Sequence, residues 1–198
     1  MLTKKIVIMA VGGQGNLLIT KILGEAALKA GVPVQISEVH GMAQRGGIVE
    51  TDVLLGDAKS STVSNGEADI LLAFEPMEAF RAMGKCNKET LVITNTARVL
   101  PFTVTTGNAV YPDVGQMMKS IRGKVKELVT VDAARLAEEA GAAMAVNMVM
   151  LGVLARKGQL PLSDDILKET IKNKVKTSFL DINQRAFNLG YEISSEPV

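Results

Sequence analysis

The chain has 198 residues, of which 47% are hydrophobic and 22% charged, as in an ordinary globular protein. Lys and Arg total 22 against 21 Asp and Glu, so no net field would attract nucleic acid or an anionic membrane surface. The single cysteine, Cys86, excludes an intrachain disulfide and a cysteine-ligated zinc or iron–sulfur site built by this chain alone.

Two apolar stretches are too short to be targeting or membrane segments. The run at 6–11 is shorter than the core of a signal peptide and leads directly into glycines. Residues 142–155 are interrupted by Asn147 and fall short of the ~20 residues that a membrane-spanning helix needs. We therefore expect one cytoplasmic domain over residues 1–198, with neither nucleic acid nor a membrane as a partner.

The first elements are predicted as strand, glycine turn, helix and strand. Residues 6–11 form a continuous apolar run, typical of a strand buried on both faces, and end at Gly12-Gly13-Gln14-Gly15. Residues 17–30 carry apolar side chains at helical spacing, and Gly31 is placed to end that helix. Residues 32–39 follow as a second strand.

Strands and helices alternate along the rest of the chain. We expect strands at 48–55, 68–74, 91–95 and 128–131, and helices at 77–83, 133–140 and 143–156. Prolines and glycines within 99–124 favour an irregular excursion. Ser163 is expected to cap one long helix that runs to Gly190. The alternation predicts an α/β fold, a three-layer sandwich with a Rossmann-like, mainly parallel sheet and helices on both faces.

The glycine turn, Gly12, Gly13, Gln14 and Gly15, is a candidate anion site. Glycines between a buried strand and a helix leave N–H groups pointing outward at the positive end of the helix dipole, which suits a phosphate. The dinucleotide fingerprint is incomplete, because Leu18 stands where its third glycine belongs. Glu38, at the end of the second strand, leaves a contact with a ribose open. The alternative is a tight connection without a ligand.

A polar segment follows the second strand and contains His40, Gln44, Arg45 and Gly46. The Arg45 guanidinium, on a backbone that glycines keep free, can bind a carboxylate or phosphate at two points, although a salt bridge in a surface turn is the simpler alternative. No acid–histidine–nucleophile pattern surrounds His40, so we assign it no proton transfer and favour a surface or interface role.

Asn147 is an amide among apolar neighbours on a predicted buried helix. It should bond to a backbone group or a ligand, since an unpaired amide there would cost ~1–3 kcal/mol. Lys85 and Lys88 near Cys86 could lower the pKa of its thiol, but we expect a small buried or half-buried thiol. The chain shows no complete catalytic set, which suggests that a cofactor or a partner chain brings the reactive groups.

Four stretches, in chain order, resemble the signatures of the gamma domain of 2-oxoacid:ferredoxin oxidoreductases and cover nearly the whole chain. They are VGGQG at 11–15, EVHGMAQRGG at 38–47, NMVMLG at 147–152 and NQRAFNLG at 183–190. The form HGMAQRGG is similar in particular to the indolepyruvate branch of that family, whose beta subunits carry it.

The resemblance implies a subunit of a complex that oxidatively decarboxylates an arylpyruvate, transfers the acyl group to coenzyme A and reduces ferredoxin. It places thiamine diphosphate and the iron–sulfur clusters on a large partner subunit, so this chain would hold no cofactor tightly and would be inactive when isolated. No catalytic or metal-binding residue is expected here. The residues expected to face coenzyme A or the partner are Gly12, Gly13, Gln14, Gly15, His40, Gln44, Arg45, Gly46 and Asn147.

Other functions stay open at this point. A gamma subunit acting on pyruvate, 2-oxoglutarate or a branched-chain 2-oxoacid would carry most of the same residues. A stand-alone NAD(P)- or coenzyme A-binding Rossmann-like protein, or a module that senses such a nucleotide, would also use the glycine turn.

Overall fold

The computed structural model describes residues 2–41 and 47–193. In this part of the chain six strands form one sheet, in the order β2-β3-β1-β4-β5-β6. The strands are β1 (Lys4–Val11), β2 (Val34–His40), β3 (Ile48–Leu55), β4 (Ile70–Ala73), β5 (Leu91–Asn95) and β6 (Glu127–Val131).

The sheet is mainly parallel, as expected. β1, β4, β5 and β6 pair in parallel, and the apolar runs of β1 and β4 are buried on both faces. β3 pairs antiparallel with both β1 and β2 and is the one strand of the described sheet that runs against the others. The hairpin of β2 and β3 therefore returns β3 beside β1 and leaves β2 at the edge.

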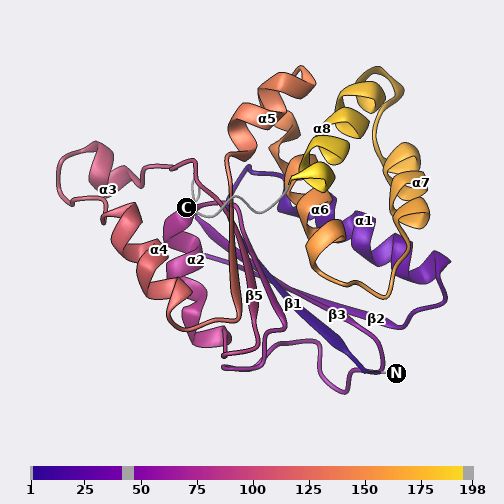
Figure 1. Cartoon of the computed structure of the whole chain (residues 1–198), viewed down its shortest axis with the longest axis horizontal. Helices are drawn as coiled ribbons and strands as arrows, with labels where there is room; N and C mark the ends of the chain where they lie inside the picture. The colour runs from indigo at the N-terminus through magenta and orange to yellow at the C-terminus, as the bar shows by residue number, and fades with distance from the viewer. Residues whose placement is uncertain (1, 42–46, 194–198) are drawn as a thin grey trace.

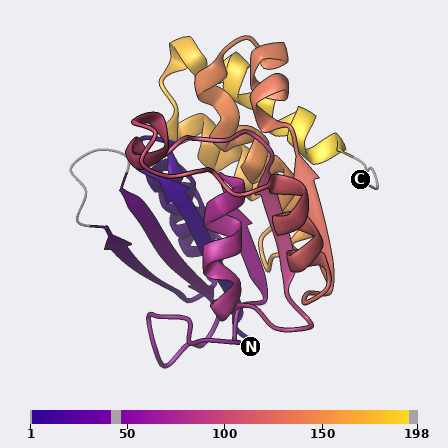
Figure 2. The same cartoon turned by 90° about the vertical axis from the view of Figure 1, so that its left-hand side faces the viewer.

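Helices cover both faces of the sheet, which confirms the three-layer architecture (Figures 1 and 2). The short α2 (Pro76–Arg81) and α4 (Val114–Arg122) lie on one face, and the larger helical layer lies on the other. That layer consists of α1 (Asn16–Lys29), α5 (Ala133–Ala140), α6 (Val146–Lys157), α7 (Asp164–Lys174) and α8 (Leu180–Glu192). None of the helices in residues 2–41 and 47–193 is long and apolar enough to cross a membrane.

Two stretches of the helical part differ from the expectation. The single helix from Ser163 to Gly190 is two helices, α7 and α8, because Val175 and Lys176 adopt extended ψ angles of 139° and 141°. The chain turns there through the 3-10 segment η3 (Thr177–Phe179). The excursion at 99–124 is also more regular than expected, since it contains the one-turn α3 (Phe102–Thr105) and the nine-residue α4.

Two glycines bring α6 and α8 into backbone contact. A Cβ added at Gly152 of α6 would lie 2.1 Å from the carbonyl oxygen of Phe187 on α8. A Cβ added at Gly190 of α8 would lie 2.0 Å from the carbonyl oxygen of Val149 on α6. No side chain fits at either position without moving a helix, so this pair of glycines fixes how α6 sits in the helical layer.

Candidate functional site

The glycine turn lies where β1 ends and α1 begins. Gly13 and Gly15 have φ angles of +97° and +82°, in the left-handed region that favours glycine. Gln14 closes the turn: its Oε1 accepts from the N–H of Val11 at 2.8 Å, and its Nε2 donates to the carbonyl of Phe74 at 3.3 Å. Phe74 follows β4, so Gln14 joins the ends of two adjacent parallel strands whose helices cover opposite faces of the sheet. Open α/β sheets bind their ligands at such a point.

The start of α1 is suited to an anion. Gly15 is its N-cap and supplies no side-chain acceptor, and the first turn contains no acidic residue. The first N–H groups of a helix have no partner within the helix, and the dipole places partial positive charge there. The turn therefore offers backbone donors and a favourable potential without the help of a basic side chain.

Asn147, near the start of α6, stands directly against the glycine turn. Its Nδ2 is 2.5 Å from the place where a Cβ of residue 15 would be. Position 15 therefore requires glycine for two reasons, because a side chain would clash with Asn147 and because the φ angle is positive. The side chain is only 7% exposed, and its Oδ1 accepts from the N–H of Met148 at 2.9 Å. The structure thus brings Asn147 together with the glycine turn, as the site prediction requires.

A cleft of about 470 Å³ opens between the glycine turn, the end of β5 and the start of α6. A second hollow of about 250 Å³ lies beside it, between α1 and the α7–α8 connection, and shares Met144 and Asn147 with the cleft. The cleft is lined by Gly13, Gln14, Gly15, Asn95, Ala97, Val99, Ala134, Ala143, Met144, Val146 and Asn147. Lys174 and Lys176 line the second hollow; Lys174 forms an ion pair with Glu25, and Lys176 adds positive charge next to the cleft.

Sequence reasoning missed Asn95 and Glu75, which follow or end neighbouring strands at the same edge. Asn95, at the end of β5, donates to the carbonyl of Phe74 at 3.3 Å and accepts from the N–H of Ala133 at 3.2 Å. Glu75 is buried and caps α2 by accepting from the N–H of Met77 at 2.7 Å. The signal that could have found both is their position, because each is a polar residue directly at the carboxyl end of a buried strand.

Glu75 also accepts from the hydroxyl of Tyr111, and burial together with this carboxylate raises the pKa of the Tyr111 hydroxyl. The phenol is therefore a permanent hydrogen-bond donor rather than an acid. Its role in the described residues is to hold the segment before α4 against the start of α2.

The polar segment after β2 meets the glycine turn through the backbone. The N–H of Gly12 donates to the carbonyl of Gly47 at 2.8 Å, because Gly47 directly precedes β3, the neighbour of β1 in the sheet. His40, at the end of β2, is exposed, and its Nε2 lies against Glu38. Because β3 intervenes, Glu38 does not stand beside the glycine turn, and the ribose contact suggested by the sequence has no geometric basis. Gln44, Arg45 and Gly46 lie outside the described residues.

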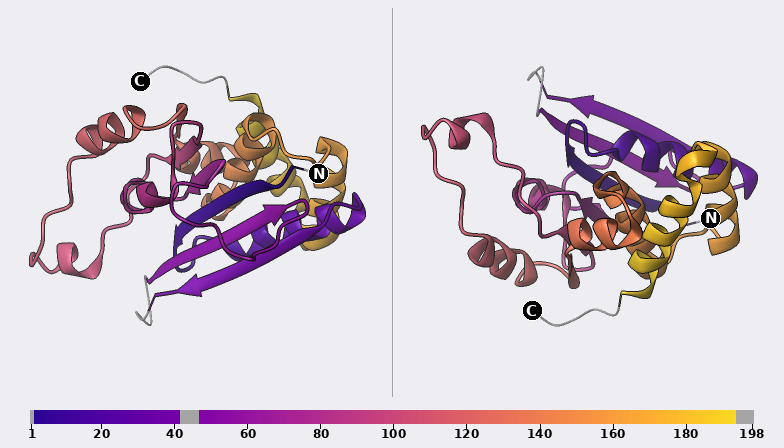
Figure 3. Two further views of the ribbon diagram at one scale, coloured as in Figure 1. Left: turned by 90° about the horizontal axis from the view of Figure 1, so that it is seen from below. Right: turned by 90° about the horizontal axis from the view of Figure 1, so that it is seen from above.

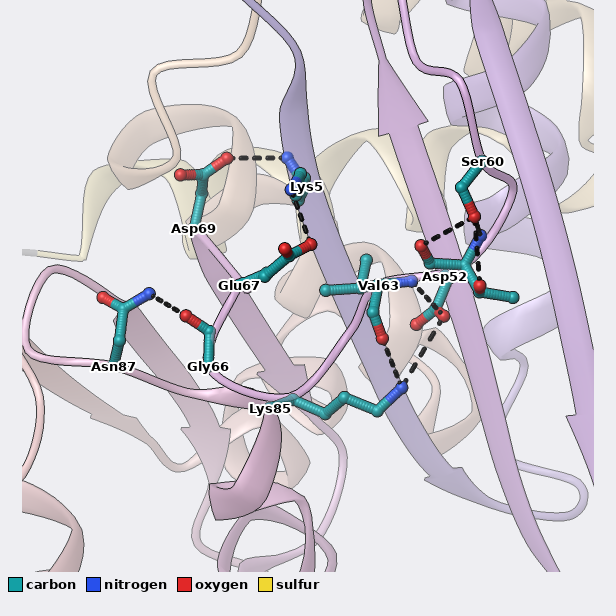
Figure 4. Close-up of polar contacts among 10 residues, drawn as sticks. Lys5, Asp52, Ser60, Val63, Gly66, Glu67, Asp69, Lys85 and Asn87 are labelled. Carbon is teal, nitrogen blue, oxygen red and sulfur yellow. Dashed lines mark hydrogen bonds and ion pairs between the residues drawn. The ribbon is translucent and has the colours of Figure 1, made fainter.

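Another polar cluster lies under the loop between β3 and β4, away from the glycine turn (Figure 4). Lys85 Nζ is 2.8 Å from Glu50 and 3.8 Å from Asp52, and it donates to the carbonyl of Val63 at 2.7 Å. Asp52 accepts from the N–H of Val63 at 2.8 Å, and burial raises its pKa. These contacts fasten the loop to the sheet, so we assign the cluster a structural role.

Cys86 is half-buried, and burial raises the pKa of its thiol to about 11. The half-buried position confirms the expectation from the sequence. Within residues 2–41 and 47–193, no group of three or more His, Cys, Asp or Glu side chains is arranged to hold a metal ion.

Comparison with known proteins agrees with this geometry. Residues 5–193 match the family model described as pyruvate ferredoxin/flavodoxin oxidoreductase. The chain belongs to this family. Membership confirms the resemblance to the gamma domain of 2-oxoacid:ferredoxin oxidoreductases and makes the chain a subunit of a complex of that type.

Individual members of the family differ in how similar they are. Indolepyruvate oxidoreductase subunit IorB of Archaeoglobus fulgidus is 39% identical, with 97% of this chain and 96% of that protein covered. The 2-oxoglutarate synthase subunit KorC of Methanothermobacter thermautotrophicus is 27% identical, with 98% and 96% covered. The crystal structure of pyruvate oxidoreductase subunit PORC of Thermotoga maritima shares the fold, with a TM-score of 0.71, 24% identity and 97% of each chain covered.

Proposed function

We propose that the chain is the small subunit of an indolepyruvate:ferredoxin oxidoreductase. The choice of indolepyruvate as substrate rests on sequence identity. The chain is 39% identical to a relative named for indolepyruvate and 27% identical to one named for 2-oxoglutarate, over nearly the same length. The complex would convert indolepyruvate and coenzyme A to the acyl-coenzyme A and carbon dioxide, and pass two electrons to ferredoxin. Related subunits are named for other 2-oxoacids, so the choice of indolepyruvate is a more specific claim than the role as a small subunit.

The reactive groups reside on the large subunit in this proposal. Thiamine diphosphate held there would provide the electron sink that decarboxylation requires, and iron–sulfur clusters held there would carry the electrons. The described part of this chain supports that division, because its one thiol is half-buried with a high pKa and no metal-ligating cluster is present there. The isolated chain is expected to be inactive.

This chain would contribute a binding surface for coenzyme A. The uncapped start of α1 offers N–H donors to phosphate, and its first turn carries no opposing carboxylate. Asn147 borders the same cleft and presents an amide beside Gly15. Gln14 supports the site indirectly, since both ends of its amide are used to hold the turn in shape.

Reconstitution tests the overall function. The large subunit, purified with thiamine diphosphate and its clusters, should reduce ferredoxin with indolepyruvate only after this chain is added. Among indolepyruvate, pyruvate, 2-oxoglutarate and a branched-chain 2-oxoacid, kcat/KM should be highest for indolepyruvate. Equal activity without this chain would refute the function, and a preference for another 2-oxoacid would refute the substrate alone.

Asn147→Asp tests the coenzyme A surface. An added carboxylate beside the cleft should raise the KM for coenzyme A by about tenfold or more through repulsion of phosphate, while the KM for indolepyruvate stays the same. Folding should persist, because an acidic residue near the start of α6 is favoured by the helix dipole. Asn188→Asp is the matched control, since it adds the same charge at an exposed position on α8 away from the cleft. Equal KM values for coenzyme A in the two variants would contradict this role.

A further inference from the structure

The segment between β5 and α4, residues 96–113, is called the arm here. It contains no buried residue, although all five residues of the preceding strand β5 are buried. Its central part, residues 99–112, also contains no charged side chain, whereas 22% of the whole chain is charged. A solvated surface loop would be expected to carry charges, and a core segment would be buried. The arm is neither, which is typical of a surface that another protein covers.

The arm is fastened firmly at its base. The buried Glu75 accepts from the Tyr111 hydroxyl and, at 3.4 Å, from the N–H of Val99. The guanidinium of Arg98 lies 5.8 Å from the centre of the Tyr111 ring, within the range of a cation–π contact. The two ends of the arm are thereby clamped to the start of α2.

Beyond this clamp the arm is built from its own contacts. The backbone hydrogen bonds of residues 101–109 that the structure records join residues of that same stretch, including the turn of α3. Its large apolar side chains are turned to solvent: Leu100 is 50%, Phe102 79% and Val110 91% exposed. A preshaped, apolar tip of this kind loses little conformational freedom on binding, which favours a tight contact.

The arm stands next to the candidate site. Its base residues Ala97 and Val99 line the cleft, together with Met144, whose side chain is also almost fully exposed. In the views of Figures 1 and 3 α3 lies at the far end of the arm, well away from the sheet. A protein that contacts both the tip and the base of the arm would therefore also border the mouth of the cleft.

We propose that the arm is the docking element of this chain for the large subunit, with Leu100, Phe102 and Val110 inserted into an apolar, uncharged groove of that partner. The inference rests on the proposed function, which requires the partner's reaction centre to reach the cleft. An arm that begins at the cleft and ends in exposed apolar side chains places the partner there. A second copy of this chain has no such reason to cover the cleft, and it is the competing occupant in the test.

The test combines three substitutions at the tip: Leu100→Ser, Phe102→Ser and Val110→Ser. The control combines Leu2→Ser, Leu28→Ser and Phe80→Ser, which remove two aliphatic side chains and one phenylalanine that are exposed elsewhere. Both variants should remain folded, because all six side chains are at least 42% exposed, and thermal melting checks that the two variants are equally stable. A tagged large subunit is co-expressed with each form, and the amount of this chain that copurifies is measured.

The tip variant should lose at least about tenfold in affinity for the large subunit, as expected when central apolar anchors are removed, while the control binds normally. Turnover of the tip variant should recover when its concentration is raised, because the cleft itself is unchanged. A photo-crosslinking amino acid at position 102 should form a covalent adduct with the large subunit.

Three outcomes would overturn the inference. A tip variant that copurifies at the normal ratio would overturn it and leave the proposed function intact. If the isolated chain forms a dimer that the tip substitutions dissociate, and the tip variant still binds the large subunit, then the arm binds a second copy of this chain instead. An unmodified chain that does not copurify with the large subunit would refute the proposed function, and the inference would fall with it.

Discussion

Gly15→Ala probes the contact on which the cleft depends. The substitution places a side chain at a φ of +82°, which costs a residue other than glycine roughly 1–2 kcal/mol. The new Cβ would also lie 2.5 Å from Asn147 Nδ2, and such overpacking typically costs about 1–3 kcal/mol. The free energy of unfolding should therefore fall by about 2–5 kcal/mol. In a domain of this size that lowers Tm by roughly 4–20 °C.

A double-mutant cycle separates the two costs. Asn147→Ala removes the amide and leaves only a Cβ, 3.3 Å from the new Cβ of residue 15. Gly15→Ala in that background should therefore cost mainly the conformational part, roughly 1–2 kcal/mol. Asn147→Ala alone should be nearly neutral, because the lost bond to the N–H of Met148 is offset by the better helix propensity of alanine. Urea unfolding at equilibrium gives all four values. If Gly15→Ala costs the same in both backgrounds, the close packing of Asn147 against the turn is not what the structure indicates.

Three further predictions concern packing and ionisation. Gly152→Ala should prevent stable folding, because its Cβ would lie 2.1 Å from a backbone oxygen of α8, whereas Gly123→Ala, with no contact under 3.7 Å, should be tolerated; circular dichroism distinguishes the two. With a pKa of about 11, only about one Cys86 thiol in a thousand is ionised at pH 8, so alkylation should be far slower in the native than in the urea-unfolded chain, and equal rates would contradict its burial. Burial raises the pKa of Asp52, so the folded chain binds the proton of this carboxyl group more tightly than the unfolded chain does. The stability gained from that proton is lost as the pH rises from 3.8 through the pKa of the folded state. Asp52→Asn keeps an acceptor for the N–H of Val63 but has no proton to lose. In urea unfolding, the stability of this variant relative to the unmodified chain should therefore increase over the same pH range, and the opposite trend would show that the fold stabilises the charged carboxylate.

The local structure around the glycine turn was predicted correctly. The turn between β1 and α1 follows from a buried strand, three glycines and a helical pattern in immediate succession. The polar character of Asn147 in an apolar helix likewise indicated a specific partner. Its position against Gly15 is a contact between residues more than a hundred positions apart, which no local pattern encodes.

The parts that depend on long-range pairing were missed. The apolar run of β3 is compatible with either strand direction, and only the hairpin with β2 makes it antiparallel to β1. This placement moved Glu38 away from the turn. The break between α7 and α8 was hidden because Val175 and Phe179 continue the helical spacing of apolar residues, and neither glycine nor proline marks the extended residues between the helices.

The helical layer explains why stretches far apart in the sequence act on one cleft. Asn147 and Gly152 lie on the same helix, five residues and therefore about 7.5 Å apart along its axis. Gly152 and Gly190 set the distance between α6 and α8 by backbone contact, and this distance fixes where the start of α6 stands. The amide of Asn147 lies at the cleft without a steric clash with the glycine turn only while α6 and α8 keep this distance. The geometry of the cleft therefore depends on Gly152 and Gly190, although neither glycine lines it.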